Sequence, residues 1–264
     1  MSISSLSFTL RIGSSQRDLS GASAVRAAAY GHHVPAMGAA LAEPDAVDRS
    51  PGTVVLVCRD KASAEVIGTA RIQRNHPQPL QIERSVALPE AMGRQTRAEI
   101  TRLAITPGAD ALLRPMLVKA CYLYAVASQI RWLVIGARSP ALIRIYRGLG
   151  FVDLLGEGQQ VPLAHAGNLP HSVLSFDVVA AERTWHASRH GLYSFMVETW
   201  HPDLQLVDEP AWQPLPVAPA LPMRKPAVAR ASVGLNVGLN VGLNLGPNLG
   251  LTAGVDAAGL RQAA

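Results

Sequence analysis

The sequence predicts a mixed α/β fold, with a mostly antiparallel central sheet flanked by helices. Two apolar, strand-like runs at 53–60 and 65–73 are separated only by the residues KASA, which is typical of a hairpin. The run RWLVIG at 131–136 is continuously apolar, as expected for a strand that is covered on both faces. Helical patterns rich in Ala and Leu separate these runs, so strands and helices alternate along the chain.

The elements of the first half follow in order. Residues 7–12 (SFTLRI) form a short strand, and the Ala-rich run 17–34 forms a helix. After the hairpin, the stretch 98–107 (AEITRLAITP) is a buried strand centred on 101–106. A helix then covers 112–128, where Pro115 suits the first turn. One face of this helix carries Leu113, Leu117, Ala120, Tyr124 and Ala127.

The second half begins with the strand 131–136 and a helix over 139–150. Gly150 is expected to end that helix as a left-handed cap, with Phe151 as the core anchor of the next segment. Residues 172–179 (SVLSFDVV) form a late strand, and the amphipathic run 183–204 closes the domain as a helix. The large apolar side chains of this last run either fill the core, which we favour, or line an apolar ligand pocket: Trp185, Phe195, Met196 and Trp200.

The chain divides near residue 208 into a domain, 1–208, and a tail, 209–264. Prolines are frequent at the start of the tail, and they interrupt helices and central strands. The repeat VGLNVGLNVGLNLGPNLGL at 233–251 carries no charge, and its Gly and Asn favour turns. We predict that the tail is disordered and assign it no chemistry, although the repeat could instead add a strand to a sheet.

The composition narrows the class of protein. The 264 residues suffice for one large domain with a hydrophobic core, and the formal charge of +5 favours an acidic partner. There is no dense Lys/Arg run with interleaved aromatics, so we expect no nucleic-acid partner. No apolar run reaches the about 20 residues of a membrane span, and the N-terminus lacks a secretion pattern. We therefore expect a cytoplasmic protein, with Cys58 and Cys121 as buried, reduced thiols.

The histidines do not indicate a metal site. His186 and His190 have the spacing that can place two imidazoles on one helix face. The run HASRH lacks the Glu of a metalloprotease motif, and no further ligands cluster near it. Neither cysteine has an obvious His partner, so a Cys–His nucleophile is not expected either.

One short stretch resembles a known family. In IYRGLGFVDL, the residues Tyr146, Gly150 and Phe151 resemble the helix-end signature of the GNAT superfamily of N-acetyltransferases. The resemblance implies the GNAT-like fold and transfer of an acyl group from a thioester. It also implies that Tyr146 could protonate the departing thiolate, while packing of Tyr146 in the core is the equally supported alternative.

The segment TPGADALLRP departs from that family. Members that bind acetyl-CoA usually carry a glycine-rich loop here, whose backbone N–H groups hold the pyrophosphate at a helix N-terminus. One glycine and two prolines stand in its place, so tight binding of free CoA is not expected. The resemblance then favours an acyl-phosphopantetheine thioester on an acyl carrier protein as donor, with no permanently bound cofactor. Arg114 and Lys119 could contact an acidic carrier, or they could be solvated charges on the helix.

A second resemblance covers roughly residues 25–105. It is to the acyl-carrier-dependent branch of the superfamily, which contains acyl-homoserine-lactone synthases and long-chain N-acyl amino acid synthases. The matching positions occur in the same order as in that branch: Arg26 and Tyr30, then Glu43, Asp45 and Asp48, then Arg71, then Glu99 and Arg102.

These charged residues allow two interpretations. Charged groups in a charge-poor chain should pair rather than be buried alone, so they could form an ion-pair network that joins the first helix to the sheet. Alternatively, part of the network is open to a zwitterionic amino acid. An arginine would then bind the carboxylate and an acidic residue would meet the amine.

Glu99 and Arg102 should point to opposite faces of a regular strand, so they can share a site only across a bulge. The superfamily resemblance implies a bulge on this strand. A bulge frees backbone N–H groups, which we expect near Ala104, Ile105 and Thr106, to polarise the thioester carbonyl. Glu99, directly or through water, is then the candidate base for the attacking amine.

The resulting prediction is a carrier-dependent N-acyltransferase that acylates the amine of an amino acid. A lactone synthase that uses S-adenosylmethionine is one alternative. The stretch GHHVP after the first-helix aromatic lacks the Trp that such synthases often carry, so we do not favour it. A non-catalytic domain that binds carrier protein or acyl chains is the other alternative.

Overall fold

The computed structural model describes residues 5–206. The predicted disordered tail lies outside the described residues, and the domain boundary near residue 208 stays a prediction. Within residues 5–206 no helix is long and apolar enough to cross a membrane.

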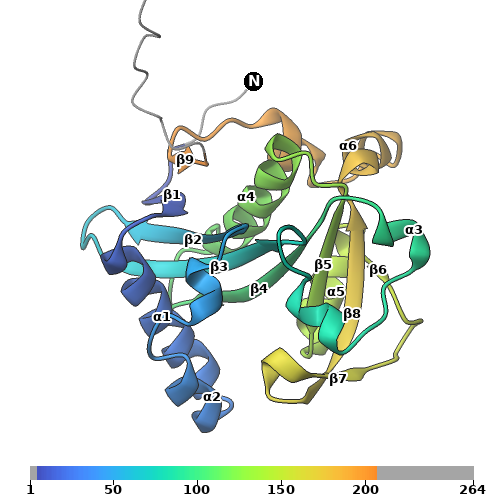
Figure 1. The fold of residues 1–264 in the computed structure, drawn as a ribbon. Helices are drawn as coiled ribbons and strands as arrows, with labels where there is room; N and C mark the ends of the chain where they lie inside the picture. Colours follow the sequence, from blue (N-terminus) through green and yellow to red (C-terminus); the bar gives the residue numbers. More distant parts are fainter. Residues whose placement is uncertain (1–4, 207–264) are drawn as a thin grey trace, which may run out of the picture. The chain divides into compact units, whose positions relative to one another are not determined.

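One sheet organises the described part of the chain (Figure 1). Its strand order is β6-β8-β5-β4-β3-β2-β1-β9, and β7 pairs with β8 off this path. Neighbouring strands are antiparallel except for the parallel pairs β4–β5 and β1–β9. The strands are β1 (Phe8–Gly13), β2 (Thr53–Asp60), β3 (Val66–Arg74), β4 (Arg97–Ile105), β5 (Trp132–Ala137), β6 (Val152–Asp153), β7 (Val161–Leu163), β8 (Leu169–Asp177) and β9 (Leu204–Gln205). The predicted mixed, mostly antiparallel α/β sheet is therefore confirmed.

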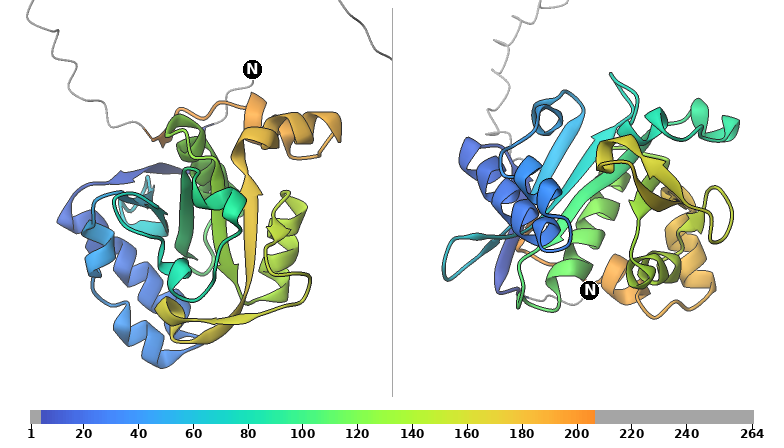
Figure 2. Two further views of the ribbon diagram at one scale, coloured as in Figure 1. Left: turned by 45° about the vertical axis from the view of Figure 1, so that its right-hand side comes forward. Right: turned by 90° about the horizontal axis from the view of Figure 1, so that it is seen from below.

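Helices cover both faces of this sheet (Figures 1 and 2). They are α1 (Gln16–Gly31), α2 (Pro35–Ala40), α3 (Glu90–Gly93), α4 (Leu113–Ala127), α5 (Pro140–Gly148) and α6 (Val178–Ala187). Short 3-10 turns η1 (Ala46–Arg49), η2 (Gln81–Arg84) and η3 (Ala164–Ala166) and the π turn η4 (Ser194–Glu198) complete the set. Ala22 and Val25 of α1 pack on one face of the sheet, with Val55 and Val57. Helix α4 packs on the opposite face.

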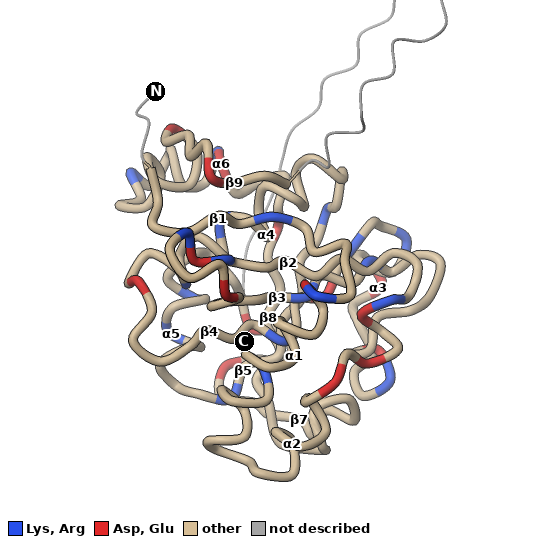
Figure 3. Tube along the Cα trace, turned by 90° about the vertical axis from the view of Figure 1, so that its left-hand side faces the viewer, with Lys and Arg blue, Asp and Glu red and all other residues tan. Residues whose placement is uncertain are grey.

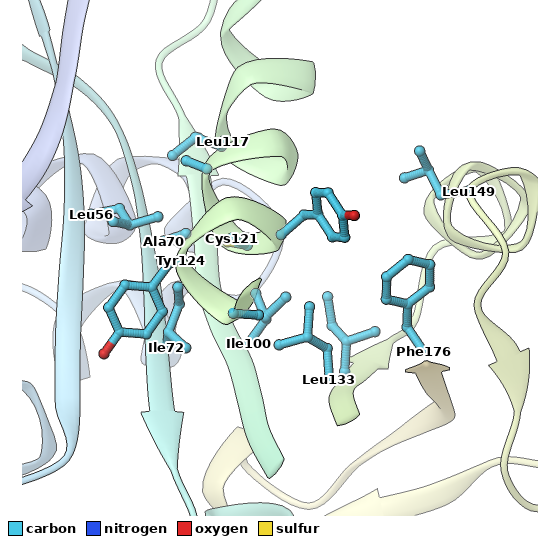
Figure 4. Close-up of a cluster of buried hydrophobic side chains, with 14 of the residues drawn as sticks. Leu56, Ala70, Ile72, Ile100, Leu117, Cys121, Tyr124, Leu133, Leu149 and Phe176 are labelled. Carbon is cyan, nitrogen blue, oxygen red and sulfur yellow. The ribbon is translucent and has the colours of Figure 1, made fainter. Parts of the chain in front are cut away.

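The main core lies under α4, as Figure 4 shows. Leu117 and Cys121 of α4 face Ile72, Ile100 and Leu133 of the sheet, and each fully buried aliphatic side chain contributes about 1.5–3 kcal/mol. Both cysteines are buried and free, as predicted. Burial raises the pKa of the Cys121 thiol to about 12, so it stays a protonated, unreactive core side chain.

The predicted helix 17–34 is wrong at its end. Helix α1 stops at Gly31, and a separate helix α2 begins at Pro35. Val34 is extended, with φ −141° and ψ 91°, because a residue before proline avoids helical backbone angles. The two helices then pack closely, since a Cβ on Gly38 would lie 2.6 Å from the Cα of Gly31.

The predicted closing helix 183–204 and the end of the strand 172–179 are also wrong. Helix α6 spans Val178–Ala187, because the Asp177 carboxylate accepts the N–H of Ala180 and caps it. The chain then turns before η4. Trp185 and Met196 are buried in the core, as favoured, whereas Phe195 is half-buried and Trp200 is 52% exposed.

Candidate active site

A gap opens between β4 and β5 in the middle of the sheet. The two strands pair in parallel only from Arg97↔Trp132 to Ile100↔Ile135. Beyond this point β4 continues along β3, while Gly136 and Ala137 of β5 pair with β8 alone. Figure 1 shows the two strands diverging. One edge of β4 therefore carries backbone groups that no neighbouring strand satisfies.

A bulge lies on β4 beside this gap, as the sequence prediction required. The register with β3 shifts, because Thr69 is opposite Ala104 whereas Arg71 is opposite Thr101. Arg102 takes a left-handed φ of 56°, which is uncommon for a residue with a side chain. The extra residue brings Arg102 and Glu99 to the same face, where both reach His165.

Of the three backbone N–H groups expected to be free near residues 104–106, the structure leaves one. The N–H of Thr106 donates to the carbonyl of Ile67 at 2.9 Å, so this part of the prediction is wrong. Alternation along an antiparallel ladder turns the N–H of Ala104 toward β3 as well. The N–H of Ile105 then points to the gap, so Ile105 is the remaining candidate donor.

Arg26 and Arg71 both take part in the predicted ion-pair network. Arg26 Nη1 donates to both carboxylate oxygens of Asp48, at 2.9 and 2.8 Å. Arg71 Nη1 donates to both oxygens of Asp45, at 2.8 Å each, and lies 3.4 Å from Asp48. Figure 3 shows acidic and basic positions lying near one another in this half of the molecule. The network joins α1, η1 and β3, which is the structural interpretation of these residues.

Arg71 has further partners, because its Nε donates to Thr101 Oγ1 at 2.9 Å and its Nη2 to Gln81 Oε1 at 2.7 Å. Both Arg26 and Arg71 are among the most completely buried side chains. Glu43 is exposed and lies outside the network. Arg26, Asp45, Asp48 and Arg71 thus already neutralise one another, and their binding of a substrate stays a prediction.

Arg102 differs from these two arginines. Within the described part of the chain no carboxylate lies at ion-pair distance from it, and its Nη2 donates only to the carbonyl of His165 at 3.2 Å. Its Nε is buried without a hydrogen-bond partner, as are Nε and Nη2 of Arg26, so the difference is the missing carboxylate. Burial, and then the positive charge of Arg71, lower the pKa of Arg102. A half-buried cation without a carboxylate partner favours an added anion, and a carboxylate matches its geometry.

Glu99 is fully enclosed, with a side-chain exposure of 0%. Its Oε2 accepts the N–H of Ile82 at 2.9 Å. Its Oε1 lies 3.1 Å from His165 Nε2, at ion-pair distance but without hydrogen-bond alignment. The sequence analysis missed His165. It lies on η3, far along the chain from Glu99, and no local spacing connects the two residues; only the strand order does.

Tyr30 and Tyr146 approach the gap from opposite faces of the sheet. The Tyr30 hydroxyl donates to the carbonyl of Leu103 on β4 at 3.4 Å. Burial raises the pKa of both Tyr30 and Tyr146. Electrostatic interaction with Tyr30 adds to the rise in the pKa of Tyr146. A phenol with a raised pKa keeps its proton at neutral pH.

The position of Tyr146 is fixed by the end of α5. The N–H of Phe151 donates to the Tyr146 carbonyl at 3.0 Å, and the N–H of Gly150 donates to the Arg147 carbonyl at 2.9 Å. This double capping requires a left-handed residue, and Gly150 has φ 100°, which confirms the predicted cap. Phe151 stacks on Phe176 with ring centroids 4.8 Å apart, which confirms it as a core anchor. Tyr146 itself is buried in the core, so core packing is shown, whereas proton donation stays a proposal.

The start of α4 carries a carboxylate. Asp110 accepts the N–H of Leu112 at 2.9 Å and the hydroxyl of Ser7 at 2.7 Å. These hydrogen bonds, with the backbone bond first, lower the pKa of Asp110, so it is ionised at neutral pH. A negative charge therefore lies where an anion-binding helix terminus would hold phosphate.

Lys119 was predicted to contact a carrier protein, and this is wrong. Lys119 is buried, and its Nζ donates to the carbonyls of Phe195 and Thr199 at 2.5 Å each. It lies on the inner face of α4, where it holds the C-terminal segment of the domain. Arg114 is half-exposed in the first turn of α4, and its contact with a carrier stays a prediction.

Metal binding finds no support in the described residues, where no group of three or more His, Cys, Asp or Glu side chains could hold an ion. His190 of the HASRH run uses its ring to contact the Gly148 carbonyl at 2.6 Å and the N–H of Leu192 at 3.1 Å. This imidazole is a structural link between α5 and the segment after α6.

The split between β4 and β5, the bulge and the capped end of α5 belong to the GNAT-like N-acyltransferase fold, and this is the fold of the chain. The solved structure of FeeM, an N-acyl amino acid synthase from uncultured soil microbes, superposes with a TM-score of 0.54 at 16% identity, over 72% of this chain and 98% of that one.

Two further similar structures superpose less well. One is BjaI, a CoA-dependent acyl-homoserine lactone synthase, with a TM-score of 0.47 at 15% identity, over 74% of this chain and 93% of that one. The other is an acetyltransferase of Trypanosoma brucei, with a TM-score of 0.40 at 19% identity, over 55% and 92% of the two chains. No protein-family model matches the chain, and no curated protein is similar to it in sequence.

Proposed function

We propose that this chain is an N-acyltransferase that moves an acyl group, a long one by resemblance, from a carrier-protein thioester to the amine of an amino acid. The observation that carries the proposal is Arg102. It is a half-buried cation without a carboxylate at ion-pair distance in the described chain, and it shares the neighbour His165 with Glu99 beside the gap in the sheet.

The acceptor is inferred from this pair of charges. A free amino acid carries a carboxylate and an ammonium group on one carbon. Arg102 supplies a bidentate partner for the carboxylate, and the Glu99 region supplies the negative charge that attracts the ammonium group. Arg26 and Arg71 serve this site less well, because Asp48 and Asp45 already neutralise them.

The donor is inferred from the start of α4. The Asp110 carboxylate accepts the backbone N–H of Leu112, so that donor is not available to a phosphate. Its negative charge also repels the diphosphate of CoA. A phosphopantetheine arm on a carrier protein has no diphosphate to place there. The fold similarity to an N-acyl amino acid synthase agrees with this donor and acceptor, and Arg114 is the cation left on α4 to meet an acidic carrier.

The reaction is direct aminolysis. The acceptor amine loses a proton to Glu99, directly or through an intervening group, and its nitrogen attacks the thioester carbonyl carbon. The N–H of Ile105 stabilises the oxyanion. The C–S bond then breaks, and Tyr146 gives a proton to the departing sulfur, so the products are an amide and a thiol. The described geometry requires no covalent enzyme intermediate.

The test is mass spectrometry of lipid extracts from cells that express the full chain or Glu99→Gln. Gln keeps an oxygen for the Ile82 N–H but cannot accept a proton. Long-chain N-acyl amino acids that are present with the full chain and lost in the variant support the proposal. Acyl lactones that require S-adenosylmethionine would instead identify a lactone synthase, and the absence of any new product despite carrier binding would identify a binding domain.

A further inference from the structure

Glu99 is enclosed, so a substrate amine cannot transfer a proton to its carboxylate directly. Its side chain has 0% exposure, and Ile82 holds one of its two oxygens. The other oxygen, Oε1, faces the ring of His165, whose side chain is 8% exposed. Of these two side chains, only that of His165 has any exposed surface.

We infer that His165 is a catalytic residue of the proposed acyl transfer, accepting the proton of the acceptor amine, and that Glu99 is its positioning residue. The inference rests on the proposed function and names the group through which Glu99 acts.

The two ring nitrogens have different surroundings. Nε2 lies 3.1 Å from Glu99 Oε1, so a proton on Nε2 faces the carboxylate. Nδ1 is buried and has no hydrogen-bond partner, which leaves its lone pair free. Catalytic hydrogen bonds commonly align only when a substrate is bound, so the imperfect alignment of the Nε2 contact is consistent with this role. An unpaired buried nitrogen is costly, and an amine N–H directed at it would remove the cost.

The backbone of His165 links the ring to the carboxylate-binding arginine. The carbonyl of His165 accepts Arg102 Nη2 at 3.2 Å, and the N–H of the preceding Ala164 donates to Ser85 Oγ at 3.0 Å. An amino acid held by Arg102 thus has its α-amine close to the same residue. The charged and titratable groups around the ring are Glu99 and Arg102 from β4 and His171 from β8.

The proton balance is complete. The acceptor enters as an ammonium ion, and His165 Nδ1 takes one proton. The freed nitrogen forms a bond to the thioester carbonyl carbon, and the C–S bond breaks with its electron pair on sulfur. The second nitrogen proton ends on that sulfur, by way of Tyr146, and His165 returns the first proton to solvent. The products are an amide, a thiol and one proton.

The test uses the purified full chain, an acyl-carrier thioester and the amino acid that gives product with the wild-type chain. His165→Asn should lower kcat about 100-fold and change KM for the amino acid by less than about threefold. His186→Asn is the control, since it removes an exposed imidazole from α6, outside the groups around the His165 ring, and it should keep kcat within about twofold.

A second acceptor separates catalysis from structure. An aminooxy analogue of the same amino acid is unprotonated at neutral pH and needs no base before it attacks. With this acceptor the defect of His165→Asn should shrink to less than about tenfold. The ratio of the two rates is measured within one variant, so it does not depend on how much of that variant is folded.

The outcomes are distinct. Equal defects with both acceptors, or a His165→Asn kcat within about threefold of wild type, would overturn the inference and leave the acyltransferase proposal standing. If the wild-type chain forms no product from the carrier thioester with any amino acid, both proposals fail.

Discussion

Two groups of charged side chains lie on the same face of the sheet, and they differ in how their charges are balanced. In the network of Arg26, Asp48, Arg71 and Asp45, each arginine faces a carboxylate at no more than 2.9 Å. In the group of Glu99, Arg102 and His165, the arginine has only a carbonyl as its partner, and two nitrogens and one oxygen lack hydrogen bonds. Two nitrogens of Arg26 also lack hydrogen bonds, so the difference between the groups is the carboxylate that each arginine does or does not face. The first group should therefore contribute mainly to stability, and the second mainly to binding and catalysis.

Arg71→Ala should give the largest effect. It leaves Asp45 without its partner and removes the cation shared with Asp48, so the free energy of unfolding should fall by about 3–5 kcal/mol. Urea denaturation followed by circular dichroism measures this change. Arg102→Ala is the control in the same experiment, and it should change stability by less than about 1 kcal/mol because no ion pair is lost. Similar losses for both variants would remove the distinction between the two groups.

Arg102→Ala should instead raise KM for the amino acid about 100-fold, which is the value of a charge-assisted bidentate contact. The effect on KM for the carrier thioester should be small, because the donor approaches through the gap. Steady-state rates at varied concentrations of each substrate separate the two constants. A larger effect on the thioester would assign Arg102 to the donor.

The pH dependence of stability tests a second ion-paired group, in which Asp18 at the start of α1 pairs with Arg11 and Arg59. Burial opposes its ionisation, but hydrogen bonds from Ser15 and Arg59 lower the pKa of its carboxyl to about 2. The folded pKa is below the unfolded value, so the stabilisation is complete above about pH 4 and is lost as pH falls toward 2. Removing it with Asp18→Asn should cost about 2 kcal/mol at pH 7 and little at pH 2. An unchanged difference in stability across this range would contradict the assignment.

Asp110→Asn should give the smallest effect. It removes the negative charge at the start of α4 and should increase the rate with an acyl-CoA donor about fivefold, with little change for the carrier thioester. Competition between the two donors at low salt measures the ratio. A ratio that does not move would show that Asp110 does not discriminate against CoA.

The sequence predicted the elements whose patterns are local. The strand 53–60 has the observed bounds and the Gly150 cap is present, since each depends on short-range chemistry. The bulge near Arg102 is also present, but it was expected from the family resemblance and not from a local pattern. The predicted helix and strand ends were wrong where a single residue starts a new element against the hydrophobic pattern. Pro35 starts α2 after α1, and Asp177 caps the start of α6.

Parts of the site could not be predicted in this way. His165 meets Glu99 only because β8 and the β7–β8 connection return beside β5, which no spacing along the chain reveals. Lys119 looked like a surface charge, because its burial depends on two carbonyls contributed by a segment near the end of the domain.

The turn that carries His165 has a further consequence. It is a short connection, Ala164–Ala166 followed by the left-handed Gly167 and Asn168, and it contributes nothing to the main core under α4. In the proposed reaction, the group that accepts the amine proton thus lies on a short connection, while the residues that bind the acceptor lie on β4. Under the proposed function, exchanging this connection for one of another sequence would be a way to change which nucleophile is acylated while leaving β4 and α5 unaltered.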